Sequence, residues 1–167
     1  MSMTAPMEWL VATKGVHGLE NYEFDAIRDF ALLWSLFEGT AMGTRGSQNE
    51  VVAAVGRMPA PDPLPPAFAA ALTFWRERYW EDGAPSASFD ALQFADNQHR
   101  SATLAVLSVK TDDPIEVTKA LLQIAMRLRN NLFHGVKWQY RLQDQFGNFS
   151  HANAVLMAAI DLSPPVS

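Results

Sequence analysis

The sequence predicts an all-α protein, a single-domain helical bundle of about five helices. Hydrophobic residues recur at three- and four-residue steps in several segments, as they do on the buried face of a helix. Capping signals precede some of these segments, and stretches rich in Gly or Pro separate them. With 167 residues, the chain is long enough for one domain with a hydrophobic core and too short for two.

The composition is typical of a soluble globular protein. Hydrophobic residues make up 49% of the chain and charged residues 19%, and no apolar run is long enough to cross a membrane. The N-terminus lacks the pattern of a secretory signal, and the chain has no cysteine, so we expect a cytoplasmic protein. A net charge of −5 argues against a broad basic surface, so any contact with nucleic acid should be local.

The N-terminal part of the chain leads into an amphipathic helix. Residues 1–22 form an N-terminal extension, in which the apolar run WLVAT is either a strand or packed extended chain. From Phe24 onward, aromatic and aliphatic residues recur at helical spacing as far as Phe37. We therefore expect a first helix that ends at Glu38 or slightly later.

Two further helices flank a proline-rich segment. Ser47 follows a Gly-rich loop and is a suitable N-cap for a short helix over residues 48–58. Residues 59–66 contain five prolines, which cannot occupy a helix interior, so this segment is a stiff connector inside the domain. The spacing of apolar residues then predicts a helix over residues 67–80.

Three helices are expected in the second half of the chain. The first covers residues 91–109. The next has the clearest start signal, because Asp113 can cap it and Pro114 suits the first helical position. It should end at about His134, where Gly135 can adopt the left-handed conformation that closes helices. The last helix is expected to be capped by Ser150 and to continue to Ile160.

The end of the long helix carries a polar cluster, RLRNNLFHG at residues 127–135. At about 100° per residue, Arg127, Asn130 and His134 fall on one flank of the apolar stripe. Arg129 lies on the other flank, about 140° from His134. Asn131 projects close to the stripe itself, and a buried amide needs partners, so we expect it to bind a neighbouring helix or loop.

The cluster combines groups that can bind a phosphate and move a proton. His134 lies at the negative end of the helix dipole, which favours its imidazolium form. The same helix end repels phosphate, so an anion there needs Arg127, Arg129 or an arginine from another chain. A histidine and arginines at a helix end are, however, also the residues that commonly cap and solvate it.

The segment RNNLFHG resembles the signature of the HEPN superfamily, the higher eukaryote and prokaryote nucleotide-binding domains. That signature is an arginine, a polar residue, further residues and a histidine. Arg129, Asn130 and His134 match these three positions, whereas Arg127 matches less well because Leu128 follows it. The likeness extends to the helical layout from residue 24 to residue 162, with an early aromatic helix and an apolar helix after the motif.

The resemblance implies a HEPN-like fold and a metal-independent endoribonuclease without a cofactor. Active members form homodimers in which the two motif helices share one cleft, so that Arg129 of one chain meets His134 of the other. An acidic residue on the early helix often lies near the motif, which makes Glu38 a candidate to orient Arg129. The implied role is a prokaryotic toxin or defence effector that cleaves RNA and has an antitoxin or regulatory partner.

The toxin branch that is paired with a nucleotidyltransferase antitoxin has a tyrosine two residues after the histidine. Val136 stands at that position here, so this form of regulation is not expected. Lys137, just past the motif, could contact the RNA backbone. No histidine or carboxylate spacing predicts a metal site, and no phosphate-binding glycine pattern is present.

The alternative is a non-catalytic HEPN-like module that dimerises or binds a nucleotide or a protein partner. In that case the motif residues serve as hydrogen bonds between helices. The acidic net charge favours this second hypothesis, since a ribonuclease benefits from basic surroundings, whereas the completeness of the motif favours the first.

Overall fold

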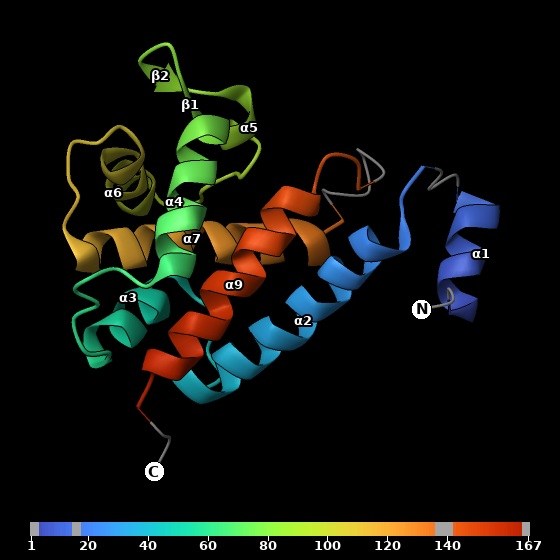
Figure 1. Ribbon diagram of the computed structural model, residues 1–167, viewed down its shortest axis with the longest axis horizontal. Helices are drawn as coiled ribbons and strands as arrows, with labels where there is room; N and C mark the ends of the chain where they lie inside the picture. Colours follow the sequence, from blue (N-terminus) through green and yellow to red (C-terminus); the bar gives the residue numbers. More distant parts are fainter. Residues whose placement is uncertain (1–3, 15–17, 136–141, 165–167) are drawn as a thin grey trace.

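The computed structural model describes residues 4–14, 18–135 and 142–164, and the predicted all-α class is confirmed (Figure 1). The described residues form eight helices and one short β-hairpin. The helices are α1 (Ala5–Lys14), α2 (Asn21–Ala41), α3 (Gln48–Arg57), α4 (Pro66–Tyr79), α5 (Ala87–Asp90), α6 (Asn97–Leu107), α7 (Pro114–Phe133) and α9 (Phe146–Leu162). The hairpin pairs β1 (Trp80–Glu81) with β2 (Ala84–Pro85) in antiparallel register. None of the helices in these ranges is both long enough and apolar enough to cross a membrane.

Helices α2 and α9 lie side by side and run diagonally across the view, while α7 passes behind α9 (Figure 1). Helix α9 also packs against α4, and α7 packs against α3 and α6. Their apolar faces enclose one large hydrophobic core to which every helix from α2 to α9 in the described chain contributes. Five aromatic side chains in this core have a relative exposure of 0%: Phe30, Phe37, Phe68, Trp75 and Phe149.

Helix α7 begins and ends where the sequence predicts. The Asp113 carboxylate accepts hydrogen bonds from the backbone amides of Ile115 and Glu116, both at 3.0 Å, and Pro114 occupies the first turn. At the other end, His134 is the C-cap and Gly135 has a φ of +79°, the left-handed conformation that glycine adopts without strain. Eleven of its 20 residues are buried, so α7 is a central helix whose end carries the polar cluster to the surface.

The predicted helix over residues 91–109 is wrong at its start. The chain leaves α5 after Asp90, and Gln93 has a φ of +55°, which no α-helix interior contains. Asp96 then caps α6 by accepting a hydrogen bond from the backbone amide of His99 at 3.0 Å. Helical spacing alone did not reveal that an aspartate inside the apolar pattern is used as a cap rather than as a solvated helix residue.

Two other boundaries also differ from the prediction. The run WLVAT belongs to helix α1 and is neither a strand nor extended chain. Helix α1 has no buried residue and contacts the rest of the chain through Met7 and Val11. Its sequence therefore lacks the clear apolar stripe from which a helix is predicted. Helix α9 begins at Phe146, four residues before the expected cap Ser150, because Phe149 is already part of the core.

Helices α4 and α9 approach closely at Gly147. A Cβ atom on this residue would lie 2.5 Å from Cζ of Phe74, far inside van der Waals contact. The Phe74 ring is stacked on the imidazole of His151 with 4.2 Å between ring centroids, and Nδ1 of His151 is 2.7 Å from the Gly147 carbonyl oxygen. The absence of a side chain at residue 147 therefore determines how near the two helices lie.

We expect Gly147→Ala to lower the free energy of unfolding by about 1–3 kcal/mol, since the added methyl group must displace the Phe74 ring. The matched control is Gly56→Ala in α3, where a Cβ would meet nothing within 4 Å. Alanine is a better helix former than glycine, so the free energy of unfolding of this control variant should rise by up to about 1 kcal/mol. Urea denaturation of both variants measures the difference, and equal shifts would contradict the close approach.

Candidate functional site

The side chain of Arg129 lies in a pocket of about 390 Å³ between α2 and the end of α7. Its guanidinium carbon is 5.4 Å from the centre of the Phe133 ring, and Nη1 donates a hydrogen bond to Oδ1 of Asn130 at 3.1 Å. The Nε atom is buried and has no hydrogen-bond partner among the described residues. The pocket therefore contains a cation whose donors are only partly satisfied by the described residues.

Glu38 faces Arg129 across this pocket. Oε2 of Glu38 accepts a hydrogen bond from the indole nitrogen of Trp34 at 2.6 Å and lies 3.8 Å from Nη2 of Arg129. The second distance is that of an ion pair and is too long for a hydrogen bond. A Cβ atom on Gly46 would lie 3.1 Å from Oε1, so the loop after α2 also confines the carboxylate. Glu38 thus lies next to Arg129, as the resemblance implies, and its role in orienting Arg129 stays a prediction.

Arg127 and Asn131 bind the chain that follows α5. Nε of Arg127 donates to the carbonyl of Leu92 at 3.0 Å, and Nδ2 of Asn131 donates to the carbonyl of Ala91 at 2.9 Å. Burial lowers the pKa of Arg127 from its usual high value, because the charged guanidinium is partly desolvated. The expected hydrogen bond of Asn131 to a neighbouring segment is confirmed, and Arg127 has a structural partner of its own.

His134 is exposed at the end of α7. Its backbone amide donates to the carbonyl of Asn130 at 2.8 Å, whereas no hydrogen bond within the described residues involves its ring. His134 is not among the residues that line the pocket of Arg129. The fold of one chain therefore does not gather the two motif residues in a single pocket, in agreement with their separate flanks on the helical wheel. Lys137 lies outside the described residues, as does Val136.

Sequence reasoning missed two aromatic residues of this pocket. Trp34 supplies the hydrogen bond to Glu38, and Phe133 covers one side of Arg129. Both pairs are separated by four residues on one helix, which places their side chains next to each other. This spacing is visible in the sequence, but spacing alone does not show that an aromatic side chain bonds to Glu38 or covers Arg129.

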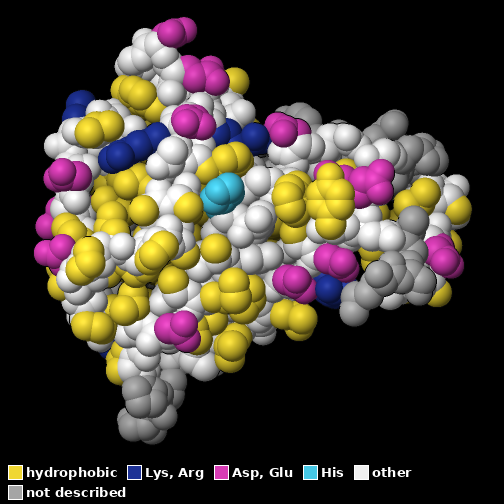
Figure 2. Space-filling view, viewed as in Figure 1, with side chains coloured by type: hydrophobic (Ala, Val, Ile, Leu, Met, Phe, Trp, Pro, Cys, Tyr) yellow, Lys and Arg dark blue, Asp and Glu magenta, His cyan; other side chains and the backbone are white. Residues whose placement is uncertain are grey.

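The charged side chains do not form a broad basic surface on the face drawn in Figure 2. Acidic side chains are scattered around this face of the described residues, and most of the visible Lys and Arg atoms lie in the upper half of the view. Hydrophobic side chains occupy much of the area between them. In the described ranges, no three His, Asp or Glu side chains lie close enough together to hold a metal ion.

Comparison with known proteins adds no relative. No protein-family model matches the chain, and neither a curated protein nor a solved structure is significantly similar to it. The site must therefore be interpreted from its own residues and from the motif resemblance.

The neighbouring residues Asn130 and Asn131 allow a matched test of which polar side chain at the end of α7 stabilises the fold. We expect Asn131→Ala to lower the free energy of unfolding by about 1–2 kcal/mol, because it removes the donor for the Ala91 carbonyl and leaves space in the core. Asn130→Ala should cost less than about 0.5 kcal/mol, since Asn130 is only partly buried and accepts from a side chain at its own helix end. Chemical denaturation measures both values, and equal losses would contradict these roles.

Proposed function

We propose that this protein is a metal-independent endoribonuclease of the HEPN type, which acts as a homodimer on RNA in the cytoplasm of a prokaryote. One observation carries the proposal: Glu38, which is bonded to Trp34, faces Arg129 in a pocket where the described residues satisfy only part of its hydrogen-bonding capacity, while the same helix ends in an exposed His134. The first group can bind a phosphate, and the second can transfer a proton. We infer a role as a toxin or defence effector that an antitoxin or another regulatory partner restrains.

The reaction would be an internal transesterification of RNA. The ribose 2′-oxygen attacks the adjacent phosphorus, the bond from phosphorus to the 5′-oxygen breaks, and a proton moves from the 2′-hydroxyl to the leaving oxygen. His134 serves as general base or acid in these proton transfers, and Arg129 stabilises the additional negative charge on the phosphorane. Asn130, already bonded to Arg129, contributes to its orientation. The products carry a 2′,3′-cyclic phosphate and a 5′-hydroxyl.

Two chains are needed because the two motif residues leave α7 in different directions. Arg129 is directed toward α2 and covers Phe133, whereas His134 lies outside that pocket. A twofold axis can bring the arginine of one chain beside the histidine of its partner. The Phe133 side chain, which lines the same pocket, is 59% exposed. Its burial against a second copy would favour association.

A specific observation also supports a second candidate, a non-catalytic HEPN-like module. Arg127 and Asn131 both bind backbone carbonyls, and Arg129 has partners within its own chain. Much of the polar cluster could therefore serve to connect helices. In that case the protein dimerises or binds a nucleotide or protein partner without cleaving RNA.

RNA cleavage in the presence of EDTA separates the two candidates. We expect the purified full-length protein to cleave single-stranded RNA, and Arg129→Ala and His134→Ala to lose about 100-fold or more in rate. His99→Ala is the matched control, since His99 bonds to Asn49 elsewhere on the surface. Absence of cleavage by the wild type, or full activity of both motif variants, would contradict the proposal.

Mixing the two inactive variants tests the composite site. If Arg129 of one chain works with His134 of the other, a heterodimer of Arg129→Ala with His134→Ala contains one intact site and one doubly altered site. Random exchange makes about half of the dimers mixed, so about a quarter of the wild-type rate should return. If subunit exchange is verified and the cleavage rate does not recover, the site is not shared between two chains in this way.

A further inference from the structure

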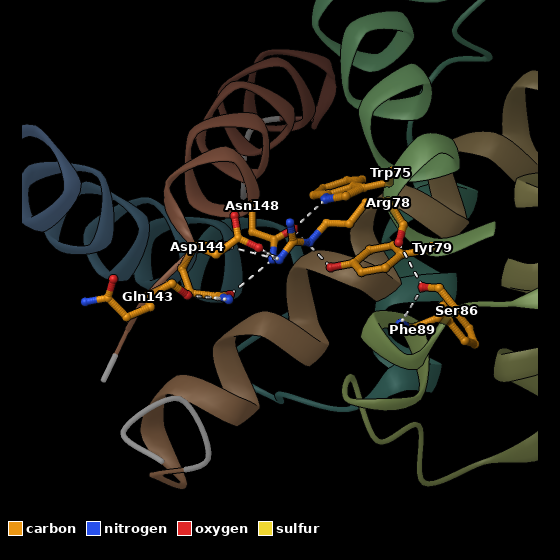
Figure 3. Close-up of polar contacts among 9 residues, drawn as sticks. Trp75, Arg78, Tyr79, Ser86, Phe89, Gln143, Asp144 and Asn148 are labelled. Atoms are coloured by element: carbon orange, nitrogen blue, oxygen red, sulfur yellow. Dashed lines mark hydrogen bonds and ion pairs between the residues drawn. The ribbon is translucent and has the colours of Figure 1, made fainter. Parts of the chain in front are cut away.

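A second pocket, of about 460 Å³, opens between the end of α4, helix α5 and the start of α9 (Figure 3). Its walls include Arg78 and Tyr79 from α4, and Ala87 and Ala91 in and after α5. Asp144, which precedes α9, and Asn148 in the first turn of α9 complete them. None of the residues of the proposed nuclease site lines it. The volume lies within the range of about 300–1,000 Å³ that is usual for small-molecule sites.

The wall formed by α5 is held firmly to α4. The β-hairpin reverses the chain after α4 through Asp82 and Gly83, both with positive φ. Ser86 then donates from Oγ to the carbonyl of Arg78 at 2.8 Å and from its backbone amide to the carbonyl of Tyr79 at 2.9 Å (Figure 3). Its hydroxyl also caps α5 by accepting from the amide of Phe89. The pocket is therefore bounded by ordered structure.

The polar groups at the floor of the pocket satisfy one another. Asn148 is only 2% exposed, and its Oδ1 accepts from the indole nitrogen of Trp75 at 3.1 Å and from the Tyr79 hydroxyl at 3.0 Å (Figure 3). Its Nδ2 donates to Gln145 at 3.1 Å. Burial raises the pKa of Tyr79, so the phenol remains a donor at neutral pH. These groups form a fixed, neutral wall.

Arg78 is the cation of this pocket, and its carboxylate partner, Asp144, is largely exposed. The Arg78 side chain is 19% exposed, and Nη2 donates to both the backbone carbonyl and the carboxylate of Asp144 at 3.0 Å (Figure 3). The Asp144 side chain is 83% exposed, so solvent screens this ion pair strongly. Nε of Arg78 is buried without a hydrogen-bond partner in the part of the chain that the structure describes. A mostly buried cation thus faces a carboxylate that can be exchanged.

We propose that this pocket binds a small monocarboxylate with an apolar body, whose carboxylate replaces the side chain of Asp144 on Arg78. A planar guanidinium binds a carboxylate through two parallel hydrogen bonds. Arg78 is the sole Lys or Arg among the described lining residues, so the charge matches a monoanion better than a phosphate dianion. The methyl groups of Ala87 and Ala91 and the Tyr79 ring offer apolar contact for the body of the ligand. The proposal is independent of the nuclease activity.

Benzoate is a suitable probe, with benzamide as its neutral analogue and inorganic phosphate as the alternative anion. Calorimetric titration of the full-length protein should give saturable binding of benzoate and none of benzamide, and inorganic phosphate should not compete with benzoate for this pocket. Arg78→Met should weaken benzoate binding about tenfold or more, because a charged hydrogen bond is lost. Asp144→Asn should tighten it about two- to fivefold, since the competing carboxylate is removed.

Two controls keep this test decisive. Arg28→Met removes a comparable ion pair on the surface of α2, in which Nη1 of Arg28 lies 2.8 Å from Oδ1 of Asp25. This variant should leave benzoate binding unchanged. Ala87→Phe fills the pocket from an exposed position without altering Arg78, and it should abolish binding even if Arg78→Met folds poorly. Wild-type protein that does not bind benzoate saturably, phosphate binding in its place, or unchanged affinity in Ala87→Phe would each overturn the proposal.

Discussion

Helix α7 is buried along more than half of its length, and the polar side chains on its buried faces must find partners inside the protein. Each of them does. The Thr118 hydroxyl donates back to the carbonyl of Pro114, and the Gln123 amide donates to the carbonyl of Gln48 at the start of α3. Asn131 holds the carbonyl of Ala91 in the same way. These bonds attach two segments, far from α7 in the sequence, to defined positions along its axis.

The position of the candidate nuclease site follows from that attachment. Because α7 is central until its last turn, the motif emerges at the surface beside the loop after α2 and the exposed face of α2. Glu38 compensates the charge of Arg129 at 3.8 Å without forming a close hydrogen bond, so guanidinium donors are left for an anion. The acidic net charge makes such local cations the natural sites for an anion.

The pocket at Arg78 depends on the same helix indirectly. Ala91 lines that pocket, and its carbonyl accepts the hydrogen bond from Asn131 of α7. The motif helix and the second pocket therefore share one structural element, the chain that follows α5. The two arginines are otherwise in similar situations. Each has a buried Nε without a hydrogen-bond partner among the described residues, and each lies beside a carboxylate that is only an ion-pair neighbour or is largely exposed.

The sequence by itself determined the helical class, both ends of α7 and the structural bond of Asn131. Those features depend on local chemistry, namely apolar spacing, the Asp113 cap, Gly135 at the helix end and an amide near the buried stripe. Only the tertiary structure decided that Trp34 and Phe133 accompany Glu38 at Arg129 and which side chains face Arg78. It also decided where α6 and α9 begin, and that α1 is helical without burying a residue. Such features depend on contacts between residues far apart in the chain, and their packing energies outweigh the local preferences that a sequence displays.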